Sequence, residues 1–331
     1  MNYYQKSKKT NIYWQYFFII VVFVCCVVKI WNTKQESQEI WVNNLFYFLY
    51  AKDYIYKFAT SILLVINTFS IILFLRRFLF LEFRNYYPAI LYLLFCFIFA
   101  NTLTLWGMVI GVFILWGILP YLFGLKEDNI NTGTFIYGLS CGILSLIYTP
   151  FLILLFLMYI VLFQERHYRI RAFILPIIGA SLAYLYLFSG FYLLDSIDMI
   201  PAYFEMIKTQ ILNIQFSIGI ENSAMFIFFL IISILLGCVS FFKIGQKTLS
   251  FTVNKRKKYI FLLLILFFQS IFTLFFHTPY HLLSQAMIIL FVVLLSISMS
   301  FMKRTIAHKI IFFVLFFIAF CYYFSGVMLN N

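Results

Sequence analysis

Three carboxylates in the first long polar segment are the residues most able to do chemistry. Glu36, Glu39 and Asp53 lie between the apolar runs 12–30 and 57–75, so they lie near a bilayer surface if both runs cross it. A carboxylate there can act as a general base or hold a metal ion. These are the candidate catalytic residues. Because no short motif surrounds them, solvated loop charges are the competing interpretation.

Other metal-binding or redox residue types show weaker patterns. His277 and His281 are four residues apart, a spacing that can present two metal ligands on one helix. Pro279 interrupts that helix, so an interfacial turn is the favoured interpretation. The six cysteines all lie in apolar runs and behave as small hydrophobic residues rather than as a disulfide framework. The sequence identifies no cofactor.

Composition places the chain in a membrane. Apolar residues make up 64% of the 331 positions and charged residues 11%, against about 45–50% and about 25% in soluble domains. The net charge of +13 is then explained by loops that orient membrane helices. No basic face interleaved with aromatic residues appears away from membrane-flanking positions, so nucleic acid is not a predicted partner.

The apolar runs predict an all-α, polytopic bundle of about eleven transmembrane helices. A crossing needs about 20 apolar residues, and lipid leaves helices as the only sensible conformation for these runs. The predicted segments are 12–30, 57–75, 87–104, 105–123, 132–148, 149–164, 172–194, 223–242, 259–276, 282–302 and 310–328.

Charge distribution predicts the orientation. With the N-terminus inside, 19 of the 24 basic residues fall in inside segments, as the positive-inside rule requires. This favours an outside C-terminus and an odd number of crossings. Basic residues flank residues 132–164 on both sides, so this stretch must enter and return. The break at Thr149-Pro150 predicts a tight hairpin, with a re-entrant hairpin and nine crossings as the alternative.

The chain reads as a single membrane domain over residues 1–331 with few polar features. Residues 31–56 are rich in aromatics and predict an outside interfacial segment, and residues 195–222 predict an outside amphipathic loop. The largest inside loop ends in a basic cluster that would attract anionic lipid headgroups, although it also serves as a topology anchor. That cluster consists of Lys255, Arg256, Lys257 and Lys258.

The membrane interior is nearly free of ionisable residues. No acidic, basic or histidine residue falls near the centre of a predicted helix, which argues against a proton-coupled pump. The central polar residues are mild, and interhelical hydrogen bonding is favoured over a substrate site. They are Asn67, Thr68, Ser140, Gln269 and Gln285.

Small residues spaced four apart predict close helix packing. Each pair places two small side chains on one helix face, so that a neighbouring backbone can approach. The pairs are Gly107 with Gly111, Gly138 with Gly142, and Gly179 with Ala183.

About a third of the chain resembles a known family. The segments 85–89, 135–148 and 168–179 carry the likeness; the last, with its Tyr168-Arg169 pair and its Leu175-Pro176 followed by Gly179, is the most specific. They resemble a domain-of-unknown-function family of multi-pass inner-membrane proteins from Bacteroidetes-type bacteria. The resemblance implies a bacterial inner membrane and an envelope context, and it implies no catalytic residues.

Three functions remain open. The first-loop carboxylates resemble, in position only, the layout of membrane glycosyltransferases that handle lipid-linked sugars during envelope biogenesis. A non-catalytic scaffold or accessory subunit of an envelope assembly, with membrane proteins as partners, fits the bare helices equally well. A transporter of an apolar or lipid substrate needs no buried charge. The sequence alone does not choose between these functions.

Overall fold

The computed structural model describes residues 2–32, 53–78, 86–98, 104–125, 129–165, 169–193, 195 and 197–212. It also describes residues 285–286, 288–293 and 295–296 near the C-terminal end of the sequence. Every regular element among these residues is helical, so the all-α prediction is confirmed for the part of the chain that is described. Residues 223–242, 259–276 and 310–328, predicted to be helices, lie outside this part, as does most of the interfacial segment 31–56.

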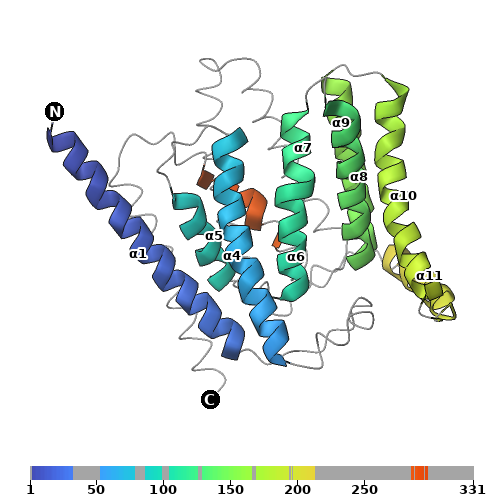
Figure 1. Cartoon of the computed structure of the whole chain (residues 1–331), viewed down its shortest axis with the longest axis horizontal. Helices are drawn as coiled ribbons and strands as arrows, with labels where there is room; N and C mark the ends of the chain where they lie inside the picture. Colours follow the sequence, from blue (N-terminus) through green and yellow to red (C-terminus); the bar gives the residue numbers. More distant parts are fainter. Residues whose placement is uncertain are drawn as a thin grey trace.

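Eleven elements make up this structure, together with the helical residues between 285 and 296 (Figure 1). In chain order they are α1 (Asn2–Asn32), α4 (Asp53–Phe78), α5 (Tyr87–Ile98), α6 (Leu105–Phe113), the π-helix η2 (Ile114–Ile118), α7 (Leu119–Gly124), α8 (Ile130–Ile147), the 3₁₀ helix η4 (Thr149–Leu154), α9 (Leu155–Gln164), α10 (Ile170–Leu193) and α11 (Met199–Leu212).

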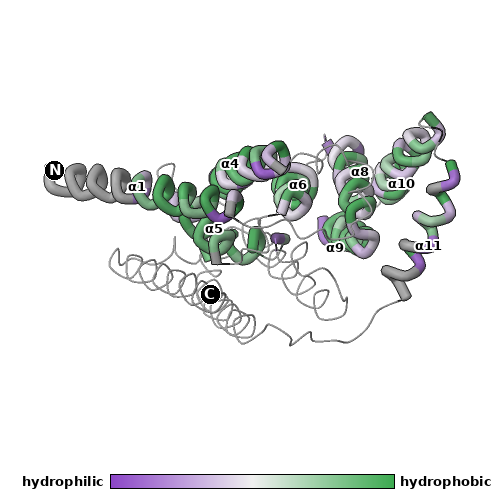
Figure 2. The backbone as a smooth tube through the Cα atoms, turned by 90° about the horizontal axis from the view of Figure 1, so that it is seen from below, coloured by the Kyte–Doolittle hydropathy of each residue, from purple (hydrophilic) through white to green (hydrophobic). Residues whose placement is uncertain are grey.

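Within the described part of the chain, four helices are long and apolar enough to cross a membrane, as expected of a membrane protein. They are Tyr54–Phe78, Leu105–Gly124, Ile130–Ile147 and Ile170–Leu193. Three shorter apolar helices accompany them, at Gln15–Trp31, Tyr87–Phe97 and Thr149–Gln164. Figure 2 shows apolar residues around most of these helices, while α11 mixes apolar and polar residues.

Neighbouring helices keep the relative directions that alternating crossings require. Tyr16, near the middle of α1, meets Tyr86 just before α5 begins, and the Lys29 ammonium donates to Phe97 O near the ends of both helices. These helices are therefore parallel.

The same relation holds for α4 and the α6–α7 segment. The Tyr56 hydroxyl accepts from Leu105 N at their starts, and the rings of Phe74 and Phe123 are in contact at their ends. The end of α4, which carries Arg76 and Arg77, and the start of α10, with Arg169 and Arg171, lie at one end of the bundle, which we call the basic end (Figure 1). The helix α11 lies at the opposite end (Figure 1).

The chain reverses direction where the Thr149-Pro150 break predicts a turn. Tyr148 leaves the helical conformation with φ −150° and ψ 108°, and η4 follows. The Tyr137 hydroxyl, in the middle of α8, donates to Leu154 O at 2.5 Å. A straight continuation would place these residues about 25 Å apart at 1.5 Å per residue, so the chain must double back. The predicted hairpin is confirmed as a turn.

Helices α8 and α10 pack with their backbones almost in contact. A Cβ on Gly138 would lie 2.1 Å from Pro176 O, and one on Gly179 would lie 2.4 Å from Phe135 O. A Cβ on Gly142 would lie 2.7 Å from Ala180 O. Lipid tails provide no hydrophobic drive between helices, so such close van der Waals packing supplies the attraction. The small-residue pairs at these positions are confirmed as packing sites.

A π-helix interrupts the segment that joins α6 and α7. Pro120 lacks an N–H, and its ring would clash with the carbonyl of Trp116 in a continuous α-helix. The turn widens at η2 instead, and Ile118 adopts φ −105°. Gly117 lies in this widened turn, where a Cβ would be 2.1 Å from Ser140 Oγ. The irregularity therefore brings α8 close to the α6–α7 segment.

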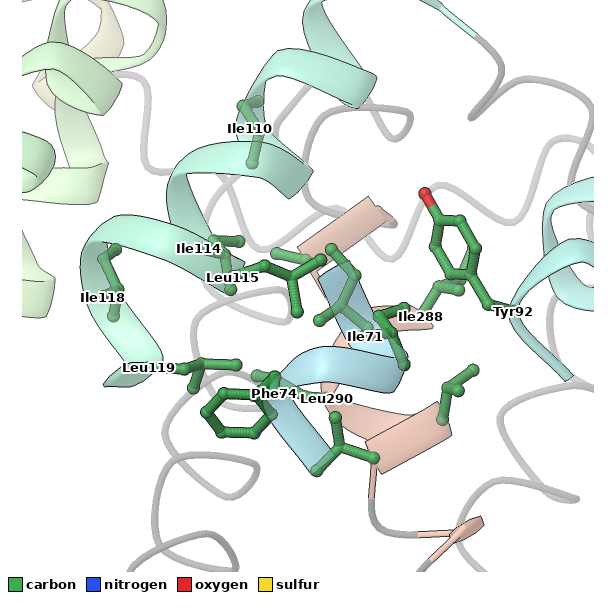
Figure 3. Packing of buried hydrophobic residues seen from close by; sticks show 14 of the residues in the cluster. Ile71, Phe74, Tyr92, Ile110, Ile114, Leu115, Ile118, Leu119, Ile288 and Leu290 are labelled. Carbon is green, nitrogen blue, oxygen red and sulfur yellow. The ribbon is translucent and has the colours of Figure 1, made fainter. Parts of the chain in front are cut away.

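The apolar core forms where α4, α5, the α6–α7 segment and the 285–296 segment meet (Figure 3). Its labelled side chains are largely aliphatic and fully or nearly fully buried. They include Ile71, Phe74, Tyr92, Ile110, Ile114, Leu115, Ile118, Leu119, Ile288 and Leu290.

Candidate functional site

The predicted catalytic carboxylates fall mostly beyond the described residues. Glu36 and Glu39 lie outside this part of the chain, and Asp53 is the first residue of α4. At the same end of α4, the Lys57 ammonium donates to Trp31 O at 3.1 Å. The catalytic role of the three carboxylates stays a prediction.

Other polar residues are also only partly described. Asp195 and Asp198 are exposed in the turn between α10 and α11, and Asp195 adopts a positive φ of 50°. Asp tolerates this left-handed region better than most residues. The histidines His277 and His281, Gln269 and the basic cluster 255–258 lie outside the described residues. Within those residues, no three histidine, cysteine or acidic side chains gather in a way that could hold a metal ion.

The most developed polar arrangement is a set of five buried residues that we call the central polar cluster. It comprises Asn67 of α4, Tyr92 and Cys96 of α5, Met108 of α6, and Gln285. All five have no exposed surface. A polar group in such a place must find its hydrogen bonds inside the protein, because lipid offers none.

Asn67 joins α4 to α6. Its Nδ2 donates to Met108 O at 2.9 Å and lies 3.6 Å from Met108 Sδ. Gly111, one turn after Met108, makes room for this contact, since a Cβ there would lie 2.8 Å from Asn67 Nδ2. The glycine of the predicted small-residue pair therefore admits a polar side chain rather than a helix backbone.

Gln285 joins the C-terminal part of the chain to α5. Its Nε2 donates to the Tyr92 hydroxyl, which itself lies 3.6 Å from Met108 Sδ. Cys96, one turn after Tyr92, places its Sγ 4.0 Å from Gln285 Oε1. Three consecutive helices and a residue at least 177 positions further along the chain thus meet at a single connected network.

The chemistry available to this cluster is hydrogen bonding. It contains amide, phenol, thiol and thioether groups, and no carboxylate, imidazole or amine. One acceptor, Asn67 Oδ1, is buried without a hydrogen-bond partner among the described residues. A neutral hydrogen-bonding network of this kind fixes the register of packed helices.

A second polar group lies at the end opposite the basic end. The hydroxyls of Ser145 and Tyr184 are 2.8 Å apart and link α8 to α10. Tyr203 of α11 is buried beside them, with its ring 6.4 Å from that of Phe188. Burial raises the pKa of Tyr203, so its hydroxyl remains neutral. These contacts seat α11, which falls within the predicted amphipathic loop, on the end of the bundle.

Sequence reasoning found part of the central polar cluster and missed the rest. Asn67 and Gln285 were predicted as interhelical hydrogen-bonding residues, and the structure confirms that role. Tyr92, Cys96 and Met108 were not singled out, because such residues are common in apolar helices. The i, i+4 spacing of Tyr92 and Cys96, which places both on one helix face, was the available signal.

Comparisons with known proteins add no relative. The chain matches no family model, no curated protein and no solved structure.

Proposed function

We propose that this chain is a multi-pass protein of a bacterial inner membrane that acts as a non-catalytic scaffold or accessory subunit of an envelope assembly. In this proposal, the outer face of α10 binds a helix of a partner membrane protein. The observation that carries it is the contrast, among the described residues, between the buried and neutral central polar cluster and the exposed apolar face of α10.

Among the four long described helices, α10 is the least buried. Only 28% of its most apolar window is buried, compared with 50–67% for the other three long helices. One stripe of this helix is exposed along its length, while the opposite stripe carries the glycines and alanines that meet α8. The exposed stripe includes Ile174, Ile177, Ile178, Leu185, Tyr186 and Tyr192.

Two hydroxyls on this stripe favour a protein partner over lipid alone. Ser181 and Ser189 are exposed among the apolar residues, and each donates to the carbonyl four residues earlier. Small and hydroxyl-bearing residues are enriched where membrane helices meet each other. Tyr186 supplies a larger ring beside them, of the kind that anchors interfaces.

Site-specific photocrosslinking tests this proposal. A photoreactive phenylalanine at Tyr186 is expected to give one discrete crosslinked protein in the native membrane, whereas the same residue at the buried Tyr137 is expected to give none. Ser181→Leu, on the same face, should reduce the Tyr186 product. Lipid adducts alone at Tyr186 would contradict the scaffold role.

We also propose that the basic end faces the cytoplasm, with about eleven crossings and an outside C-terminus. The gathering of arginines at one end of the described helices supports this orientation. A reporter fused after Asn331 that is active only outside the cytoplasm is the expected result. A cytoplasmic reading would break the scheme of eleven crossings.

The glycosyltransferase-like function is the second candidate, for one reason. Asp53 begins α4 at the same end of the bundle as α11, so one of the three carboxylates and a short helix of mixed polarity share one end. In that function, Glu36, Glu39 or Asp53 acts as the base or metal ligand.

A further inference from the structure

The end of α4 holds an arginine in an unusual setting. Arg76 and Arg77 occupy its last turn, and Arg77 is exposed while Arg76 is partly buried against α5. The Arg76 guanidinium lies 5.2 Å from the centre of the Tyr86 ring. Stacking of this kind is a known stabilising contact for guanidinium groups and holds the group in one orientation.

Two nitrogens of this guanidinium lack an acceptor. Nε and Nη2 of Arg76 are buried and have no hydrogen-bond partner among the described residues. Ring stacking leaves the N–H groups at the edge of the guanidinium plane, where they still require oxygen atoms. A buried cation without acceptors is costly, so an anion that supplies them would be bound favourably.

Polar groups of α1 and α5 surround the same place. The Tyr16 hydroxyl donates to the Tyr86 hydroxyl at 2.8 Å, and Gln15 Oε1 accepts from Tyr86 N at 3.3 Å. The Tyr16 ring lies 4.9 Å from the Tyr86 ring, and the residue is 43% exposed. We call the group formed by Arg76, Tyr16 and Tyr86 the arginine–tyrosine site; Tyr16 is its exposed member, on the side of α1.

We propose that the arginine–tyrosine site binds the phosphodiester headgroup of an anionic phospholipid. Its position at the basic end of apolar helices is where lipid headgroups meet a membrane protein, and tyrosine and arginine are characteristic of this depth. An arginine can bind two phosphate oxygens at once through parallel N–H groups, which matches its two unsatisfied nitrogens. This inference is independent of the scaffold role and of the basic cluster at residues 255–258.

Native mass spectrometry of the full chain in mild detergent tests the proposal. The probes are phosphatidylglycerol, phosphatidylcholine with the same acyl chains, and inorganic phosphate. The wild-type chain is expected to bind the first phosphatidylglycerol more tightly than phosphatidylcholine. Arg76→Gln is expected to weaken phosphatidylglycerol binding by about tenfold, because hydrogen bonds between charged groups are the strong class.

Matched variants separate this site from general charge attraction and from misfolding. Arg171→Gln removes an exposed arginine from the same end of the bundle and should leave phosphatidylglycerol binding unchanged. Arg76→Lys keeps the charge and loses the paired N–H geometry, so it should bind less tightly than wild type while folding normally.

Three results would overturn the proposal. Equal binding by wild type and by folded Arg76→Lys and Arg76→Gln chains would show that the guanidinium holds no headgroup. An equal loss in Arg171→Gln would show attraction to net charge alone. Competition by inorganic phosphate as strong as that by phosphatidylglycerol would assign the site to a free anion instead of a lipid.

Discussion

The bundle contains two regions that hold their helices together in different ways. Between α8 and α10, glycine and alanine let one backbone lie against another, and Gly138 and Gly179 occupy positions where a Cβ would meet backbone atoms. Around α4, α5 and α6, the contact passes through buried side chains such as Asn67 and Gln285. Backbone contacts cannot adjust, whereas side chains can move, so the two regions should respond differently to substitution.

The largest expected effect belongs to the backbone contact. Gly138→Ala should lower the free energy of unfolding by about 3 kcal/mol, at the upper end of overpacking costs, because its Cβ would lie 2.1 Å from Pro176 O. Thermal unfolding in detergent measures the change. Gly190→Ala is the matched control on α10, since a Cβ there meets nothing within 4 Å. That control should stabilise the helix by about 0.5–1 kcal/mol. Equal changes in the free energy of unfolding for Gly138→Ala and Gly190→Ala would contradict a rigid backbone contact between α8 and α10.

A double-mutant cycle tests the side-chain contact between α4 and α6. Gly111→Ala places a Cβ 2.8 Å from Asn67 Nδ2, and Asn67→Ala removes the bond to Met108 O. Each single change should cost about 1 kcal/mol. In the double variant the methyl group added at position 111 has no amide side chain to displace, so the total cost should fall well below the sum. If the costs of the two single changes were strictly additive, the space at Gly111 would not be needed for the Asn67 side chain.

The smallest expected effect concerns a hydrogen bond near the surface. The Trp116 indole N–H donates to Ser70 Oγ at 2.6 Å, linking η2 to α4. Ser70→Ala should destabilise the protein by about 0.6 kcal/mol, the average for interhelical hydrogen bonds in membranes. Ser181→Ala, whose hydroxyl bonds within its own helix, should change the stability less. A larger loss of stability in Ser181→Ala than in Ser70→Ala would contradict a stabilising role for the hydrogen bond between Trp116 and Ser70.

The sequence predicted most of the features that local residue spacing encodes, and few of the contacts between segments that are distant along the chain. Apolar runs predicted the described helices other than α11, which falls in the predicted amphipathic loop. The Thr149-Pro150 break predicted the turn, and the small-residue spacing predicted the contact between α8 and α10. These are local signals. The partnership of Tyr92 with Gln285 joins residues 193 positions apart, and no local pattern encodes such a pairing.

Two further features lay beyond sequence reasoning. The π-helix at η2 depends on how Pro120 is accommodated, and a kink was an equally reasonable outcome for that proline. The arginine–tyrosine site depends on the parallel approach of α1 and α5 to the end of α4, which brings Tyr16 and Tyr86 to Arg76. In contrast, the carboxylates Glu36, Glu39 and Asp53 remain a prediction from their position in the first loop.

Complementation of a deletion strain tests the central claim, that α10 and not the first-loop carboxylates carries the function. Lipid-linked sugars and envelope glycans would be measured by mass spectrometry in cells with either of two triple variants. The scaffold role predicts that the chain with Glu36→Ala, Glu39→Ala and Asp53→Ala restores the wild-type profile. It also predicts that the chain with Ile178→Ala, Leu185→Ala and Tyr186→Ala reproduces the deletion. Accumulation of a lipid-linked intermediate in the carboxylate variant alone would contradict it and establish an enzyme.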